Sequence, residues 1–445
     1  LVPRGPLRPD PLLPPHLRPV WHRRLQGGIH GVLDSLAVSL AAWVGSWPLI
    51  AWYFHLFTPV SLVANLVVVP LSGLALMSGL GSLICGAWLP WAGELFNHAG
   101  WFFMLCMTKA SEWAADMPGG YCYVAAPGLA LVALFYGALG ALLGGWFQQR
   151  FRWWVAGALG VLAAAWVGLN IHARAATRIT ILPLNGGDAV WVDAPGRADD
   201  WLIDCGDSRL SQFVTTPFLR AQGAGALPRL ALSHGDVRHT GGATNLFKDF
   251  AVKELAISST RFLSQPYRHA VAAWTNAHRP VRTLKAGDHW GAWTVLHPKA
   301  GDRFPQADDS VLVLRAAWNG CRVLFCSDLS PTGQDALLRQ SRDLRAEILV
   351  AGMPKGGEPA HDALLDAVQP RLIVIADADY PATERVSPRL RARLIKRQVP
   401  VLFLRESQAV TLELRRGCCV GQDMTGNKFS MDSRDSHARQ PFRVD

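Results

Sequence analysis

Residues 233–242 read SHGDVRHTGG and hold the features that decide the fold. Two histidines, His234 and His239, flank Asp236, and a Gly-Gly turn follows at once. The apolar run LPRLAL before them predicts a buried strand that delivers this loop at its end. Divalent-metal hydrolases gather His and Asp ligands from such loops, because the strands are held while the loops converge. The loop therefore predicts a metal site, and a polar loop with backbone-bonded histidines is the alternative.

Two further residues bear on that site. Arg238 lies inside the loop, where a second carboxylate would help to hold a metal. Asp328 ends the strand in LFCSDLS and is suited to bridge two metals. Asp328 thus favours a metal site, whereas the positive charge of Arg238 opposes one.

Short strands surround this loop from residue 178 onward. RITILPL, DAVWVDA and DDWLIDCG are apolar runs bounded by Gly or Asp, which predicts successive strands. SVLVLRAAWNGCRVLFCSD predicts a hairpin that turns at Asn319-Gly320. The later strands in RAEILVAG, PRLIVIADA and PVLFLRE alternate with helical stretches. We therefore expect residues 172–416 to form an α/β sandwich of two sheets with helices outside (αββα), and residues 417–445, which have few apolar side chains, to form a disordered tail.

The first part of the chain has the composition of a membrane protein. The 445 residues are 50% hydrophobic and 18% charged, with a net charge of +10 and a mean hydropathy of +0.15. After a Pro- and Arg-rich segment, 1–30, residues 31–171 contain apolar runs long enough to span a bilayer: 31–54, 61–89, 126–146 and 153–171. Residues 91–117 carry several charges and predict either an amphipathic interfacial helix or a span inside a helical bundle.

Basic residues set the orientation of these spans. Arg23 and Arg24 precede the first span, and Arg150 and Arg152 separate the last two, so both clusters are expected in the cytoplasm. The segment 91–117 must then cross, which gives about five spans in an inner (plasma) membrane. This topology places residues 1–30 in the cytoplasm and the sandwich on the extracytoplasmic side.

Polar residues interrupt the apolar part of the chain. Asn65 and Pro70 lie in the second apolar run, and His98 lies in the segment after it. Asn65 and His98 are candidates for lining a polar path across the membrane. Ordinary contact between membrane helices, to which small and polar residues contribute, is the alternative.

Several stretches together resemble one known family. LNGGDAVWVDAP, WLIDCG, LSHGDVRHTGG, DDSVLVLR, LFCSD and VPVLF follow one another as in a metallo-β-lactamase-type domain. PVSLVANLVVVPLSGLALMSGLGSL and FNHAGW resemble the membrane region of ComEC-type competence proteins, which end in such a domain. The resemblance covers about residues 30–415 and implies a role in natural transformation, as a membrane channel through which single-stranded DNA enters the cytoplasm. Full-length members carry further membrane helices, so this chain would be N-terminally truncated.

The same resemblance assigns residues to a metal centre, and the assignment is incomplete. His234, Asp236 and His239 match ligand positions, Asp328 matches the bridging carboxylate, and Asp188 and Asp204 match structural acidic positions. The family's remaining ligand positions hold other residues here: Arg238, Lys355, Gly356 and Ser387. We therefore expect no metal or a single Zn or Mn, and not a two-metal centre. Asp236 and Asp328 would then form ion pairs with Arg238 and Lys355. No catalytic residue is assigned.

A positively charged cleft would still suit a phosphodiester chain. The candidate DNA contacts are Arg209, Arg261, Arg268, Lys355 and Arg385, unless they form a solvated face. Phe262, Tyr267 and Trp274 are either stacking platforms for bases or core.

Three functions follow from this sequence. The first is a DNA-uptake component whose external domain guides DNA, with single-stranded DNA, membrane lipids, other uptake components and further copies of the chain as partners. The second is a membrane-tethered, metal-dependent nuclease or phosphodiesterase that degrades the strand left outside, which would make the chain a hydrolase. The third is a domain that serves only in assembly.

Overall fold

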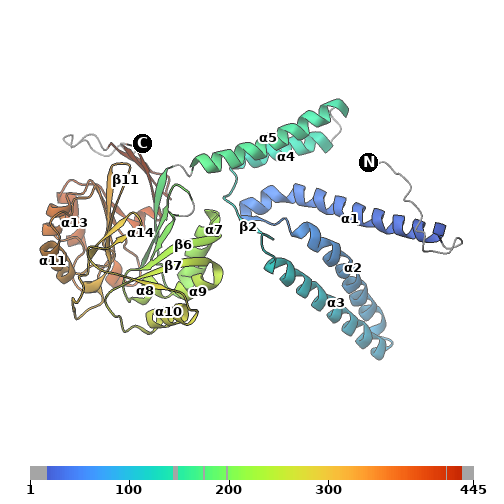
Figure 1. Ribbon diagram of the computed structural model, residues 1–445, viewed down its shortest axis with the longest axis horizontal. Helices are drawn as coiled ribbons and strands as arrows, with labels where there is room; N and C mark the ends of the chain where they lie inside the picture. The colour runs from blue at the N-terminus through green and yellow to red at the C-terminus, as the bar shows by residue number, and fades with distance from the viewer. Residues whose placement is uncertain (1–17, 144–148, 174–175, 197–198, 417, 433–445) are drawn as a thin grey trace. The chain divides into compact units, whose positions relative to one another are not determined.

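The computed structural model describes residues 18–143, 149–173, 176–196, 199–416 and 418–432 (Figure 1). Its internal contacts divide the chain into a helical unit up to Leu162 and a sheet-rich unit that takes nearly all residues from Ala163 onward. The predicted order of apolar helices before an α/β domain is confirmed.

Long helices make up the helical unit: α1 (Arg18–Tyr53), α2 (Ser61–Gly86), α3 (Pro90–Asp116), α4 (Leu129–Leu143) and α5 (Gln149–Ala173). Strands β1 (Leu56–Phe57) and β2 (Cys122–Tyr123) pair antiparallel and join the α1–α2 connection to the α3–α4 connection. Two helical segments, Leu33–Tyr53 and Ser61–Gly86, are long and apolar enough to cross a membrane, and the apolar helices Leu129–Leu143 and Trp153–Leu169 are shorter.

Helices α2 and α3 form a hairpin that is held together through small residues. Gly81 lies against the ring of Phe96, and Gly93 lies against the backbone of Gly86, so that a methyl group at either glycine would overlap its neighbour. Close backbone approach of this kind is typical of helix pairs in membranes. Of the two path candidates, Asn65 is half-buried and His98 is exposed.

The first sheet of the α/β unit has nine strands in the order β18-β17-β16-β3-β4-β5-β6-β7-β8. The strands β3, β4 and β5 meander antiparallel, whereas β5 to β8 run parallel. Their bounds are β3 (Thr177–Pro183), β4 (Asp188–Asp193), β5 (Trp201–Ile203), β6 (Ala226–Leu232), β7 (Ala251–Ser258), β8 (Val281–Leu284), β16 (Val410–Arg415), β17 (Cys418–Asp423) and β18 (Lys428–Asp432).

The second sheet has seven strands in the order β15-β14-β13-β12-β11-β10-β9. Strands β9 to β12 are antiparallel and β12 to β15 parallel. Their bounds are β9 (His289–Trp290), β10 (Trp293–His297), β11 (Val313–Trp318), β12 (Cys321–Phe325), β13 (Ile348–Ala351), β14 (Leu372–Ile375) and β15 (Val401–Phe403). The predicted hairpin turn is confirmed: Trp318 pairs with Cys321, and both Asn319 and Gly320 have positive φ.

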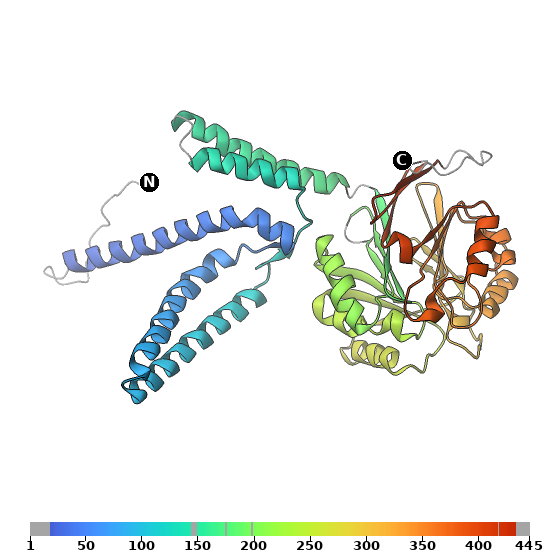
Figure 2. The same cartoon turned by 180° about the vertical axis from the view of Figure 1, so that it is seen from behind.

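Three layers of buried side chains show how the sheets are stacked. One core joins the two sheets and contains Ile179 and Val190 of the first with Val323 and Val350 of the second. A second core lies between the nine-stranded sheet and its helices: α6 (Ser208–Leu210), a π-helical turn (Ser211–Thr215), α7 (Thr216–Ala221), α8 (Val237–Thr240), α9 (Ala243–Asp249) and α10 (Gln265–Asn276). A third lies between the seven-stranded sheet and α11 (Pro331–Gln340), α12 (Asp362–Val368) and α13 (Pro388–Lys396), with α14 (Leu404–Ser407) after β15. The predicted αββα sandwich is therefore present, with helices on both outer faces (Figures 1 and 2).

The expectation of a disordered tail from residue 417 is wrong for residues 418–432. Strands β17 and β18 extend the nine-stranded sheet beyond β16, with Leu414 paired to Cys419 and Val420 to Ser430. Phe429 and Met431 alternate along β18 and are buried in the core between the sheets. Because this stretch has few apolar residues, the short alternation of apolar and polar residues that is typical of a strand was not recognised.

Candidate metal and ion-pair site

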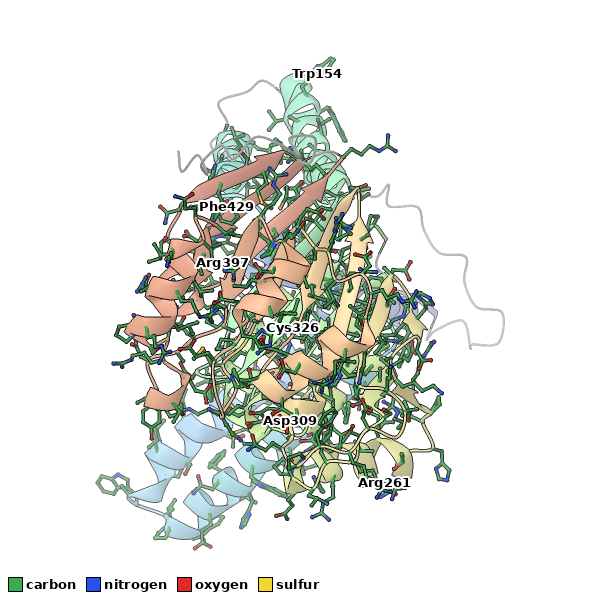
Figure 3. All side chains as sticks on the ribbon, turned by 90° about the vertical axis from the view of Figure 1, so that its left-hand side faces the viewer. Trp154, Arg261, Asp309, Cys326, Arg397 and Phe429 are labelled. Atoms are coloured by element: carbon green, nitrogen blue, oxygen red, sulfur yellow. The ribbon has the colours of Figure 1, made fainter. Side chains whose placement is uncertain are left out.

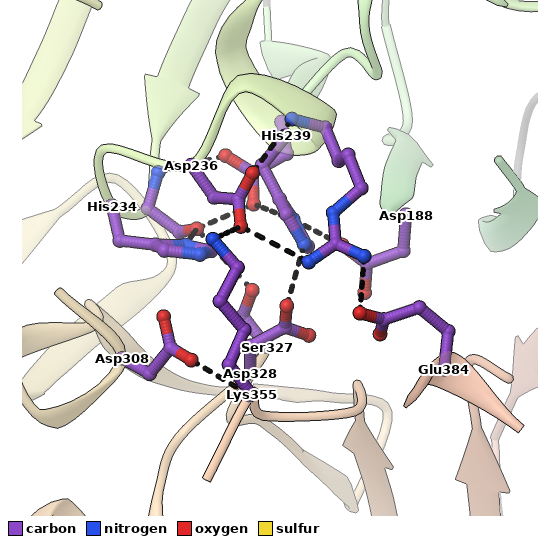
Figure 4. Close-up of polar contacts among 12 residues, drawn as sticks. Asp188, His234, Asp236, His239, Asp308, Ser327, Asp328, Lys355 and Glu384 are labelled. Atoms are coloured by element: carbon purple, nitrogen blue, oxygen red, sulfur yellow. Dashed lines mark hydrogen bonds and ion pairs between the residues drawn. The ribbon is translucent and has the colours of Figure 1, made fainter. Parts of the chain in front are cut away.

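The loops at one edge of the two sheets bring the predicted site residues together. The loop 233–242 leaves β6, Asp204 follows β5, and Asp328 follows β12, while Asp188 begins β4. Asp236 caps α8, because its Oδ1 accepts a hydrogen bond of 3.0 Å from the backbone N–H of Arg238. His234, Asp236, His239 and Asp328 therefore converge from both sheets (Figure 4).

Ser233 fixes the hydrogen bonding of His234. The Ser233 hydroxyl lies 2.5 Å from Oδ2 of Asp204 and 2.8 Å from Nδ1 of His234. The same hydroxyl lies 3.3 Å from Oγ of Ser327. His234 is fully buried, and no hydrogen-bond partner is found for its Nε2 among the residues that the structure describes. Burial first, and then the charge of His239, hold the pKa of His234 well below its usual range. His234 is therefore neutral, and one of its two ring nitrogens is left for a ligand.

His239 is surrounded by carboxyl groups. Its Nε2 lies 2.9 Å from Oδ2 of Asp328, and its Nδ1 lies 3.2 Å from Oδ2 of Asp204 and 3.1 Å from Oδ1 of Asp188. Burial opposes charge on this imidazole, but the carboxylates outweigh it and raise its pKa well above the usual range. Burial raises the pKa of Asp328 to about 7. His239 therefore links Asp188 and Asp204 of the first sheet to Asp328 of the second.

Arg238 joins the loop after β6 to the loop that follows β14. Its guanidinium lies 3.3 Å from Oδ2 of Asp236 and is hydrogen-bonded to Oε1 of Glu384.

Burial opposes ionisation of Asp236, yet the hydrogen bond from Lys355 and the contacts with Arg238 hold the pKa of Asp236 well below the usual range. Gly187 lies so close to the Arg238 carbonyl that a Cβ there would overlap it, which explains why a glycine is present at this position.

Lys355 reaches the same carboxylate from the seven-stranded sheet. Its ammonium lies 2.6 Å from Oδ2 of Asp236, and its backbone N–H donates to Oδ2 of Asp308 at 2.9 Å. The sequence prediction that Arg238 and Lys355 pair with Asp236 is confirmed by these distances. Asp328 pairs with His239 instead, which corrects the expected pairing for that residue.

Four residues of the site were missed from the sequence. Asp308 and Glu384 lie in short 3-10 turns, η3 (Asp308–Ser310) and η4 (Ala382–Glu384), and Ser233 and Ser327 each precede a ligand candidate. The adjacent carboxylates of DDS at 308–310 were the available signal for Asp308. Two predicted positions face other neighbours: the Ser387 hydroxyl caps α13, and a methyl group added at Gly356 would lie 3.4 Å from the side chain of Gln306.

The exposed arginines proposed as DNA contacts lie on α6 (Arg209), in the loop before α10 (Arg261) and on α10 (Arg268). Arg209, Arg261 and Arg268 are exposed, and none of them forms an ion pair within the described parts of the chain; Figure 3 shows Arg261 at the surface. Arg385 is exposed but lies 3.5 Å from Asp379. Of the two alternatives for the aromatic residues near Arg268, the core alternative is confirmed, because these side chains are buried: Phe262, Tyr267 and Trp274.

Two overlapping groups of buried side chains could hold a metal ion. They are Asp204, His234 and His239, and His234, Asp236 and Asp308, and within each group the ligand atoms lie within 4.8 Å of one another. The unpartnered Nε2 of His234 fits a cation beside it. The residues fit a pair of metals poorly, since Arg238 and Lys355 place positive charge on Asp236 and both ring nitrogens of His239 already face carboxylates.

Comparison with known proteins shows similarity to competence proteins. Residues 12–149 match the family model described as Competence protein. The chain is 26% identical to ComE operon protein 3 of Bacillus subtilis (strain 168) over 365 residues, which are 76% of this chain and 46% of that protein. It is 27% identical to competence protein ComA of Neisseria gonorrhoeae over 401 residues, which are 87% of this chain and 53% of that protein. The chain spans about half the length of these curated relatives.

Solved structures align with about half of this chain. A metal-dependent hydrolase of the β-lactamase superfamily aligns with 52% of this chain and 98% of its own, at 14% identity and a TM-score of 0.35. A metallo hydrolase from Ignicoccus hospitalis aligns with 54% of this chain and 100% of its own, at 12% identity and a TM-score of 0.34. The chain thus resembles competence proteins of the ComEC/ComA type over most of its length, and its apolar helices precede an α/β sandwich.

Proposed function

We propose that this chain is an inner-membrane component of natural transformation that helps single-stranded DNA into the cytoplasm. Its metallo-β-lactamase-like domain lies on the extracytoplasmic side and guides DNA without a two-metal hydrolytic centre. The observation that carries this proposal is the Asp236 carboxylate, which the Lys355 ammonium and the Arg238 guanidinium both contact. The competence relatives supply the DNA-uptake context.

Electrostatics explains why these contacts oppose a metal pair. A dication about 5 Å from one fixed positive charge is repelled by roughly 7 kcal/mol at an effective dielectric of 20. Lys355 and Arg238 each add such a charge beside Asp236. In addition, each replaces a ligand that the family resemblance expects. The cavity therefore favours its internal ion pairs over two bound metals.

Three exposed arginines on and next to α6 and α10 support the DNA role. Arg209, Arg261 and Arg268 are exposed, and they form no ion pair within the described ranges. Neutralising phosphates with such side chains releases counterions, which gives salt-dependent affinity without sequence preference. This effect would let the domain hold a strand of any sequence near the membrane.

The test is the binding of fluorescent single-stranded DNA to the full chain in lipid nanodiscs, at several salt concentrations. We expect Arg261→Ala/Arg268→Ala to weaken binding and to reduce the salt slope by about one for each phosphate that is no longer neutralised. Arg342→Ala/Arg345→Ala, on exposed residues that precede β13 at the opposite edge of the sheet, is the matched control. Equal binding by all three proteins would contradict the DNA-guiding role.

One observation favours the alternative of a membrane-tethered, metal-dependent nuclease or phosphodiesterase. His234, Asp236 and Asp308 are close enough to share one ion, and some enzymes work with three ligands and one metal. Elemental analysis of Zn and Mn in the full chain, followed by cleavage assays with and without chelator, separates the two functions. Chelator-sensitive cleavage that His234→Ala abolishes would establish the nuclease.

A further inference from the structure

The protonation of His234 follows from the hydrogen bonds around it. The hydroxyl of Ser233 has one proton, and its 2.5 Å bond to the Asp204 carboxylate takes that proton. The oxygen of Ser233 is then an acceptor for Nδ1 of His234, 2.8 Å away, so the ring proton is on Nδ1. Nε2 therefore carries a bare lone pair. It is buried, and no partner is found for it among the described side chains.

Two carboxylates from different sheets lie beside the imidazole of His234. Asp236 comes from the loop after β6 and Asp308 from the turn before β11, and their ligand oxygens and the His234 nitrogen lie within 4.8 Å of one another (Figure 4). Asp308 is buried, and its Oδ2 is held by the backbone N–H of Lys355 at 2.9 Å. The resemblance to the competence family assigns no ligand at position 308.

Lys355 reaches this group from the solvent side. Its Nζ lies 2.6 Å from Oδ2 of Asp236, while 59% of its side chain is exposed against 2% for Asp236. A long, exposed stem lets the ammonium leave without any change in the core. The backbone N–H that holds Asp308 would stay in place when the side chain moves. The cation at this position is thus tethered but displaceable.

We propose that His234, Asp236 and Asp308 form a site for one divalent transition-metal ion, and that the ammonium of Lys355 competes with the metal for it. An imidazole nitrogen and two carboxylates suit Zn²⁺ or Mn²⁺. This inference rests on the ion-pair network of the proposed function. It adds that a metal ion and the Lys355 ammonium can replace each other beside Asp236. The family resemblance expects a metal ligand at position 355, where this chain has Lys355. Asp308, which is hydrogen-bonded to the backbone N–H of Lys355, supplies a ligand in its place.

The experiment measures Zn²⁺ affinity of the full chain in detergent, by competition with a fluorescent chelator after removal of bound metal. Lys355→Met keeps the length of the side chain and removes its charge. We expect it to tighten Zn²⁺ binding by on the order of 100-fold relative to the native chain, since a fixed positive charge no longer repels the dication. Lys253→Met, on an exposed lysine of β7, is the control and should bind as the native chain does.

A second variant identifies the ligand. Asp308→Asn in the Lys355→Met background should lose on the order of tenfold or more in affinity, as expected for removal of one anionic ligand. The absorption spectrum of bound Co²⁺ should change with it, because that spectrum reports the ligand set. Unchanged affinity in Lys355→Met, or unchanged affinity and spectrum on adding Asp308→Asn, would overturn the inference and leave the proposed function standing. Two tightly bound metals in the native chain would instead overturn the proposed function.

Discussion

The ammonium of Lys355 lies 2.6 Å from the buried carboxylate of Asp236, and the two residues come from different sheets. Asp236 follows the parallel strand β6 and Lys355 follows the parallel strand β13. The contact therefore links the site edges of both sheets. It also occupies the region where the family resemblance expects metal ligands, so that the position contributes to stability in the absence of a metal.

The first prediction concerns this carboxylate. Asp236→Asn should lower the free energy of unfolding by about 2–4 kcal/mol, because it leaves Arg238 and Lys355 without their shared counter-charge in a largely buried place. The measurement is thermal unfolding of the full chain in detergent with a chelator present. Asp335→Asn, at a surface pair with His361, is the control and should change stability by less than about 1 kcal/mol. Equal effects of the two variants would show that the network contributes nothing.

The second prediction restores the residue types that the family resemblance expects. Arg238→Asp/Lys355→His replaces two cations by a carboxylate and an imidazole. Without metal, the variant should be less stable than the native chain, because Asp236, Asp308 and Glu384 then repel one another with less cationic compensation. Zinc should reverse this loss by about 2.7 kcal/mol when its concentration is 100 times the dissociation constant.

The matching measurement is the unfolding temperature of both proteins with and without zinc. A single Arg238→Gln variant controls for simple loss of the guanidinium and should gain little from zinc. If zinc stabilises the native chain as much as the double variant, the cations do not oppose metal binding.

The sequence predicted much of this site because its residues lie at strand ends. His234, Asp236, His239 and Asp328 follow strands whose apolar runs are plain, so their convergence at one edge could be foreseen. The pairing of Arg238 with Asp236 could also be foreseen from their proximity in one loop. Glu384 could not, because it lies in a 3-10 turn far along the chain and no periodic pattern marks it.

Burial settles an alternative that the sequence left open. Phe262 and Tyr267 were candidates for base stacking, but they are buried and contact each other edge to face, with ring centroids 5.2 Å apart. Sequence alone did not distinguish an aromatic ring in a core from one at a surface, since both occur beside polar loops. The strands β17 and β18 were missed because long polar stretches surround only a few apolar positions.

The third prediction concerns acid stability. Glu347 accepts hydrogen bonds from Arg322 at 2.7 Å through both the guanidinium and the backbone N–H. Burial would raise the pKa of Glu347, but these bonds outweigh it and lower the pKa. The contribution is therefore present above the ordinary glutamate pKa of about 4.3 and is lost as pH falls through the lower folded value.

Glu347→Gln should accordingly cost on the order of 1 kcal/mol at neutral pH, with allowance for solvent screening. Unfolding temperatures measured from pH 7 down to about pH 3 should converge for the variant and the native chain. Asp199→Asn, at an exposed residue that pairs with Arg229, should show a smaller difference throughout. A difference that stays constant with pH would mean that the charge of Glu347 is irrelevant.

The last prediction tests whether the C-terminal strands belong to the core. Phe429 on β18 is 4% exposed and lies among the buried residues between the two sheets, next to Met431 and Cys419. Phe429→Ala should lower the free energy of unfolding by about 3 kcal/mol, because it removes a buried ring and leaves a cavity. Phe213→Ala is the matched control, since Phe213 is 68% exposed and little burial is lost there. Thermal unfolding of both variants in detergent decides the question. Similar small losses would mean that β17 and β18 are a dispensable extension, whereas a large loss for Phe429 alone makes them part of the sandwich that positions the site.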